Sequence, residues 1–166
     1  MNLLETERLT LRWITLQDAP LLLAVMNEPT FIEQVADRGL RSTADAERYI
    51  AEKMLASFAQ FGFGMYVVAL KETGEAIGTC GLFKRETMDE VDIGYAFLRQ
   101  FWGRGFAYEA AAAVLAYGRD VLQLPKIVAM TAPGHERSIK LIEKLGLRFE
   151  RMVDLPGFDR PSKLFA

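Results

Sequence analysis

The sequence predicts one α/β domain with a central mixed sheet and helices on both faces, and three observations support this. The chain has 166 residues, a length that suits a single domain, so we assign residues 1–166 to one unit. Strand-like and helix-like segments alternate along the chain, as in layered α/β proteins. A strand, a helix and a second strand follow one another across residues 91–131, which predicts a right-handed crossover and a parallel pair of strands.

The first third of the chain predicts one strand and two helices. Residues 9–13 alternate apolar and polar side chains, the pattern of a half-buried strand. Asp18 is a candidate N-cap for an apolar helix over residues 21–26. A second helix is expected from residue 43 or 45 to about residue 60. Its apolar stripe would run through Ala46, Tyr49 or Ile50, Lys53 or Met54, and Phe58.

The rest of the chain predicts a meander followed by alternating helices and strands. Strands at 63–70 and 76–83 flank a turn in which Gly74 occupies the position that tolerates positive φ, and a third strand covers 91–98. An alanine-rich helix is expected from residue 103 to about Gly118. The remaining elements are a strand at 127–131, a helix at 135–145 stopped by Gly146, and strands at 149–153 and 163–166.

Composition excludes several classes of function. Twenty Lys and Arg against 22 Asp and Glu give a formal charge of −2, without the basic stripe that nucleic-acid binding needs. The single cysteine, Cys80, cannot form a disulfide within the chain, and there is no C-x-x-C pair, so we expect no metal site. No apolar run reaches the ~18 residues of a membrane span, and the first residues do not have the pattern of a signal peptide. We therefore expect a cytoplasmic protein without a membrane partner.

The most informative stretch is the glycine loop, residues 100–107 (Gln-Phe-Trp-Gly-Arg-Gly-Phe-Ala), at the junction of a predicted strand and a predicted helix. Backbone N–H groups at a helix start have no intrahelical partner and carry partial positive charge, so they bind anions. Gly103 and Gly105 lack a Cβ atom, which lets a bulky diphosphate approach the backbone closely. Arg104 would add a cation at the rim of such a site.

Two common nucleotide motifs do not fit this loop. A dinucleotide fingerprint needs a third Gly, or Ala, where Tyr108 stands, and a Walker A loop needs a Gly-Lys-Ser/Thr ending that is absent. The alternative without a ligand is that Gly103 and Gly105 only shape a tight strand-to-helix turn.

The loop resembles the Q/R-x-x-G-x-G/A pyrophosphate loop of the GNAT N-acetyltransferases, with Gln100, Gly103 and Gly105 at its three defined positions. The resemblance implies a GNAT-like fold, with a mostly antiparallel sheet and a splayed parallel pair. It also implies acetyl-CoA as cosubstrate and transfer of its acetyl group to an amine. Segments similar to the branch with the ribosomal-protein N-terminal acetyltransferases lie at 5–12, 93–95, 106–110, 137–140 and 143–146.

The resemblance also implies a cosubstrate site, by position. Backbone groups at 96–98 would pair with the pantetheine arm, and N–H groups from 102 or 103 through 107 would meet the diphosphate. His135 replaces the asparagine that the family usually has at the start of the next helix. The implied cosubstrate-binding residues are Ala96, Phe97, Leu98, Gln100, Trp102, Gly103, Arg104, Gly105, Phe106, Ala107, His135 and Ser138.

The implied catalytic groups depart from the family pattern at one position. Ile142 stands where the family often has a tyrosine acid, and it has no proton to donate. Ser138 matches a serine that some members use, and would hydrogen-bond the sulfur as negative charge develops on it. A thiol pKa near ~8.5 makes the thiolate a tolerable leaving group near neutral pH. The N–H group of Leu98 is the candidate oxyanion donor.

The acceptor is expected to be a primary amine, either a protein N-terminus or a small molecule, attacking directly in a ternary complex. Asp92 is the candidate base and Glu90 the reserve, because alternate residues of the strand share one face. The alternative for Asp92 is a solvent-facing carboxylate. Glu33 and Glu90 are the candidate acceptor-binding residues. A non-catalytic acyl-CoA sensor or interaction domain is the alternative function, and both a monomer and a homodimer remain open.

Overall fold

An eight-stranded mixed sheet runs through the computed structural model, which describes residues 2–166. Its strands are β1 (Asn2–Glu5), β2 (Leu9–Trp13), β3 (Met65–Leu70), β4 (Ala76–Lys84), β5 (Val91–Phe97), β6 (Ile127–Thr131), β7 (Phe149–Val153) and β8 (Ser162–Phe165). They lie in the order β1-β2-β3-β4-β5-β6-β8-β7. Among these strands only β5 and β6 pair in parallel, and the other neighbours are antiparallel. The predicted mixed sheet is confirmed.

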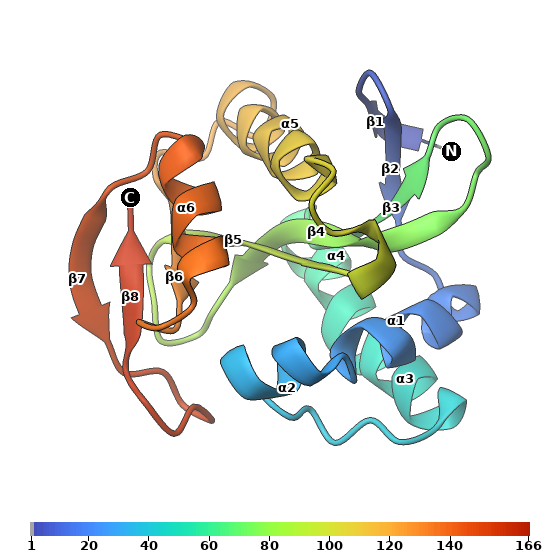
Figure 1. Cartoon of the computed structure of the whole chain (residues 1–166), viewed down its shortest axis with the longest axis horizontal. Helices are drawn as coiled ribbons and strands as arrows, with labels where there is room; N and C mark the ends of the chain where they lie inside the picture. Colours follow the sequence, from blue (N-terminus) through green and yellow to red (C-terminus); the bar gives the residue numbers. More distant parts are fainter. Residues whose placement is uncertain (1) are drawn as a thin grey trace.

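Helices cover both faces of the sheet (Figure 1). The long helix α5 crosses one face beside α6, while α1 to α4 lie on the other. The α-helices are α1 (Ala19–Met26), α2 (Pro29–Gln34), α3 (Thr43–Tyr49), α4 (Ala56–Phe61), α5 (Phe106–Asp120) and α6 (Glu136–Lys144). Two 3₁₀ turns, η1 (Leu16–Asp18) and η3 (Arg99–Phe101), and a π-helical segment, η2 (Ile50–Leu55), complete the elements.

Every predicted element is present, and one short strand and one short α-helix were not predicted. The strand β1 has four residues at the edge of the sheet, and its side chains are exposed or half-buried. The helix α2 has six residues and buries none of them. Both are therefore too short, and too weakly buried, to produce a periodic apolar pattern. Pro29 at the start of α2 was the available signal, because proline favours the first position of a helix.

The second predicted helix is one continuous rod made of α3, η2 and α4. Its buried stripe consists of Ala46, Ile50, Met54 and Phe58, each four residues from the next. In a regular α-helix such a stripe would rotate by about 40° at each step. The π-helical segment has more residues per turn, so it keeps the stripe facing the sheet.

Asp18 is the N-cap residue of α1, as predicted, but its side chain makes no capping bond to that helix. It instead accepts hydrogen bonds from the Arg12 guanidinium at 2.7 and 2.9 Å and from the Thr15 N–H group at 2.8 Å. Burial opposes ionisation of this carboxyl, but these donors outweigh it and lower the pKa of Asp18. The ion pair fixes the chain between β2 and α1.

Candidate functional site

The parallel strands β5 and β6 separate part-way along their length. They pair from Val91–Ile127 to Ile93–Ala129, and β5 then continues to Phe97 without a partner on that side. On its other side β5 remains paired with β4 as far as Phe97. The predicted splay is present, and it leaves one edge of β5 open over its last four residues.

The open edge exposes different backbone groups from those predicted. The Leu98 N–H group donates to the Ile77 carbonyl at 3.0 Å, so it faces β4 and is not available as an oxyanion donor. Because alternate residues of a strand direct their N–H groups to opposite edges, the Tyr95 and Phe97 N–H groups face the splay and that of Ala96 faces β4. The Leu98 N–H group therefore does not suit the predicted role, and the Phe97 N–H group is the neighbouring donor that faces the splay.

The glycine loop turns sharply into α5. Gly103 and Gly105 have φ angles of +77° and +80°, in the left-handed region that favours glycine. The Trp102 N–H group donates to the Arg99 carbonyl, and the first helical bond of α5 joins the Glu109 N–H group to the Gly105 carbonyl. The Trp102 N–H group is therefore not available for the predicted anion site, and the donors that could form it are those from Gly103 to the start of α5.

Arg8 holds this loop from a distant part of the chain, a role the sequence did not indicate. Its Nη1 donates to the Arg104 carbonyl at 2.8 Å and its Nε to the Glu109 carboxylate at 2.7 Å. The guanidinium also lies 4.4 Å from the centre of the Phe106 ring. The only available signal was the position of Arg8 in the 5–12 segment that carries the family resemblance.

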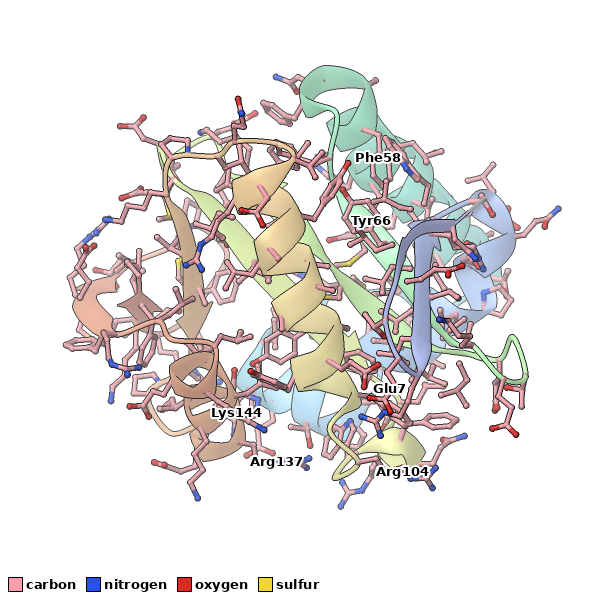
Figure 2. All side chains as sticks on the ribbon, turned by 90° about the horizontal axis from the view of Figure 1, so that it is seen from above. Glu7, Phe58, Tyr66, Arg104, Arg137 and Lys144 are labelled. Atoms are coloured by element: carbon pink, nitrogen blue, oxygen red, sulfur yellow. The ribbon has the colours of Figure 1, made fainter. Side chains whose placement is uncertain are left out.

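A cavity of about 310 Å³, called here the loop cavity, lies between the glycine loop, the open edge of β5 and α6. Three cationic side chains of α6 line it: Arg137, Lys140 and Lys144. Figure 2 shows Arg104 and Arg137 at the end of the molecule where α5 begins, with Lys144 nearby on α6. Of the predicted cosubstrate residues, Ala96, Phe97, Trp102, Gly103, Gly105, Phe106, Ala107, His135 and Ser138 line this cavity, whereas Leu98, Gln100 and Arg104 do not.

The α6 cations also contact aromatic side chains across the cavity. The Arg137 guanidinium lies 4.3 Å from the Trp102 ring centre, and Lys144 Nζ lies 4.2 Å from that of Tyr108. Such cation–π contacts hold positive charge beside the N-terminus of α5. The loop cavity therefore combines backbone donors, a helix dipole and three side-chain cations, a combination that suits an anionic ligand.

A second cavity of about 280 Å³, the sheet cavity, lies next to the loop cavity and is also lined by β5. Its walls come from β5, β6, the α1–α2 region and the turn before β8. The two cavities share one group of lining residues: Val25, Phe31, Val35, Tyr95, Ala96, His135 and Ser138. Ligands in the two cavities would therefore meet at the end of β5.

A hydrogen-bonded pair of hydroxyls stands at this junction. The Tyr95 hydroxyl and Ser138 Oγ are 2.8 Å apart, and Ser138 is only 9% exposed. Burial raises the pKa of Tyr95 to about 12, so its hydroxyl is protonated at neutral pH. The sequence indicated Ser138 but not its partner, because 43 residues separate the two. Ile142, at the position of the family's tyrosine, is buried in the core.

His135 lines both cavities at the start of α6. Its side chain makes no capping bond to that helix. Burial lowers the pKa of His135, and the nearby Arg137 and Arg160 lower it further. The imidazole is therefore neutral at pH 7, with one donor and one acceptor nitrogen.

Asp92 lines the sheet cavity and is 4% exposed, so the alternative of a solvent-facing carboxylate is wrong. Its Oδ2 accepts a hydrogen bond from Arg85 Nε at 2.8 Å. Burial raises the pKa of Asp92, and Arg85 opposes that rise. A buried carboxyl with a raised pKa is typical of general acid–base groups, and also of structural ion pairs.

Glu90 and Glu33 do not line the sheet cavity. Glu90 lies at the opposite end of β5, where it is within 3.3 Å of Arg151 and 4.0 Å of Lys126. Glu33 is exposed on α2, and its carbonyl accepts a hydrogen bond from Arg160. The structure therefore does not bring either carboxylate to the cavity for which it was predicted.

Metal ligands, membrane spans and the lone cysteine add nothing to this site. Residues 2–166 contain no group of three or more His, Cys, Asp or Glu placed to hold a metal ion. None of the helices in that range is long and apolar enough to cross a membrane. Cys80 is buried in β4, and burial raises the pKa of its thiol, as expected of a structural cysteine.

Comparison with known proteins identifies the family. The profile of the acetyltransferase (GNAT) domain matches residues 8–148. The chain is 33% identical over 155 residues to the uncharacterized N-acetyltransferase p20 of Bacillus licheniformis, covering 92% of this chain and 86% of that protein. It is also 33% identical over 156 residues to the uncharacterized N-acetyltransferase YoaA of Bacillus subtilis, covering 91% and 85%.

Solved structures share the fold. A crystal structure of an acetyltransferase from Agrobacterium tumefaciens is similar with a TM-score of 0.83 and 29% identity, covering 98% of this chain and 91% of that one. The ribosomal-protein acetyltransferase RimL, in complex with coenzyme A, also has a TM-score of 0.83, at 15% identity and coverage of 99% and 96%. The family profile, the relatives and the splayed sheet agree: the chain belongs to the GNAT acetyltransferase family and is an N-acetyltransferase.

Proposed function

We propose that the protein transfers the acetyl group of acetyl-CoA to a primary amine by direct attack within a ternary complex. The observation that carries the proposal is that two cavities lined by β5 meet at Tyr95 and Ser138. The loop cavity would take the acetyl donor and the sheet cavity the amine.

The loop cavity fits coenzyme A in three respects. The N–H groups from Gly103 to Ala107 and the dipole of α5 suit a diphosphate. Arg137, Lys140 and Lys144 add positive charge for its phosphates. The open edge of β5 offers the Tyr95 and Phe97 N–H groups to the amides of the pantetheine arm. Bound acetyl-CoA supplies a thioester whose carbonyl carbon is attacked by the amine nitrogen, with release of the thiol.

The junction residues would stabilise charge and hold protons during this reaction. Ser138 Oγ donates to the sulfur as negative charge develops there, while the protonated Tyr95 hydroxyl donates to Ser138 and orients it. The Phe97 N–H group is positioned to serve as the oxyanion donor. Asp92 is our candidate for taking the amine proton, through a water molecule, because its raised pKa lies closer to neutrality.

Thermal melts with acetyl-CoA, coenzyme A, NADH and ATP, followed by an assay of thiol release, test the proposal. Gly103→Glu is the informative variant, and Gly74→Glu is its matched control. Both glycines have a φ of +77°, and no atom lies within 4 Å of the place that a Cβ atom would take, so the two substitutions impose the same backbone strain. Of Gly103 and Gly74, Gly103 lines the loop cavity and Gly74 does not.

We expect coenzyme A and acetyl-CoA to raise the melting temperature of the wild type and of Gly74→Glu by about 5–10 °C at ~100 times the dissociation constant. Gly103→Glu should fold but show no shift. Equal shifts with NADH and ATP, or none with coenzyme A, would contradict the cosubstrate assignment. Binding without thiol release for any amine would instead favour a non-catalytic acyl-CoA sensor.

A further inference from the structure

The charged side chains that line the sheet cavity are unbalanced. Among the described residues that form its wall, the cations are Arg38 and Arg85 and the one carboxylate is Asp92. Arg85 and Asp92 neutralise each other through their 2.8 Å ion pair. His135 is neutral at pH 7 because burial and nearby arginines lower its pKa. Arg38 is left as the uncompensated charge of the cavity.

The Arg38 side chain has an unused hydrogen-bond donor. Its Nε is buried and has no hydrogen-bond partner among residues 2–166. The guanidinium lies 5.6 Å from the ring centre of Phe158, which Arg85 approaches from 5.9 Å. Leaving a buried donor of a charged group unpaired is costly, so an acceptor atom of a ligand at this position would be stabilising.

The unpaired Arg38 side chain favours some classes of acetyl acceptor over others. Guanidinium groups bind carboxylates and phosphates through paired N–H donors. A polyamine would instead bring further positive charge toward Arg38, with no unpaired carboxylate in the described cavity wall to receive it. A volume of about 280 Å³ is close to the lower end of small-molecule sites, which favours a compact acceptor.

We infer that the acceptor is a small primary amine that also carries an anionic group, a carboxylate or a phosphate, and that Arg38 binds this anion. The inference rests on the proposed acetyl transfer and adds the chemical class of the acceptor. The amine end lies toward Tyr95 and Ser138, where the two cavities meet, and the anionic end lies toward Arg38.

A panel of matched amines tests this inference through thiol release from acetyl-CoA. The pairs are glycine with glycinamide, β-alanine with β-alaninamide, and phosphoethanolamine with ethanolamine; spermidine and a serine-initiated neutral peptide complete the panel. Rates are compared per concentration of free amine, because the amines differ in pKa. The carboxylates and the phosphate separate the two kinds of anion, and each neutral partner isolates the effect of charge.

We expect at least one anionic amine to exceed its neutral partner in kcat/KM by about tenfold or more, the usual effect of a hydrogen bond to a charged group. Arg38→Gln should remove this preference, and Arg38→Glu should shift it toward spermidine. Arg151→Gln is the matched control, because it removes the same charge from an exposed ion-pair cluster that does not line either cavity. The melting shift with coenzyme A should be the same in all three variants and the wild type.

Three results would overturn the inference. Preference for the neutral amines, the peptide or spermidine in the wild type would assign the cavity to another class of acceptor. An unchanged preference in both Arg38 variants would show that Arg38 does not bind the anion. Failure of acetyl-CoA to bind, or of every amine to react, would overturn the proposed function as well. The first two results would overturn only the inference about the acceptor, so failure of the inference is distinguishable from failure of the proposed function.

Discussion

The two cavities that meet at the end of β5 are built in different ways. The loop cavity takes its polar groups largely from the backbone of one continuous segment that includes the end of β5, the glycine loop and the first turn of α5. The sheet cavity is lined by side chains from helices, strands and loops spread over most of the chain. A site made of backbone depends on local conformation, which a short motif can specify. A site made of dispersed side chains has no such signature, and it varies without changing the fold.

Substitutions of the hydroxyl pair at the junction are expected to have the largest effect on activity, because Tyr95 and Ser138 line both cavities. Tyr95→Phe and Ser138→Ala should each lower kcat by about 100-fold, the usual effect of removing one donor to a developing negative charge. Since the two hydroxyls act as one hydrogen-bonded unit, the double variant should be little slower than the slower single variant.

Steady-state kinetics with acetyl-CoA and the best amine measure this effect. The KM for each substrate should change by much less than kcat. Fully additive losses in the double variant would show that the hydroxyls act independently, and an unchanged kcat would remove Ser138 from the catalytic assignment.

A smaller effect is expected from the side-chain cations of the loop cavity, because its backbone carries most of the binding. Lys140 is exposed, so Lys140→Gln should weaken coenzyme A binding by about twofold to fivefold at low salt and by less at high salt. Isothermal titration at two salt concentrations measures the change. Lys53→Gln, an exposed lysine that lines neither cavity, should leave the affinity unchanged. A loss that is independent of salt would contradict an electrostatic role for Lys140.

The smallest effect is expected at Glu90, which lies outside both cavities. Glu90→Gln should leave kcat/KM for any acceptor unchanged and lower the free energy of unfolding by at most about 1 kcal/mol, as for an exposed ion pair. Kinetics and urea denaturation measure the two quantities. A tenfold or larger drop in kcat/KM would return Glu90 to the position of candidate base.

Much of the fold could be predicted because its longer elements have clear periodic patterns. The alternation at residues 9–13 and the β-branched run at 127–131 correspond to β2 and β6 with no change in their bounds. The short elements β1 and α2 were missed, since their stability depends on neighbours rather than on a pattern of their own. The π-helical segment was also not predicted. The spacing of the buried side chains along it differs from that of an ordinary α-helix by no more than one or two residues.

The site was predicted where its position follows from the local chain, and missed where it depends on long-range contacts. The glycine loop and Ser138 fall beside the cavity, whereas the partners Tyr95 and Arg8 act across 43 and 101 residues. The Leu98 N–H group was predicted to face the splay, but it faces β4. Strand identity can be inferred from a sequence, but which edge each N–H group faces depends on the register with β4.

The short parallel pairing between β5 and β6 has a consequence for the mechanics of the molecule. Only three residue pairs, from Val91–Ile127 to Ile93–Ala129, join the first five strands to the group formed by β6, β8 and β7. A ligand whose amides pair with the open edge of β5 would act as a short additional strand across this seam. A ligand bound in the loop cavity would then hold the two parts of the sheet together. The resistance of the sheet to separation would increase with the fraction of protein that has the acetyl donor bound.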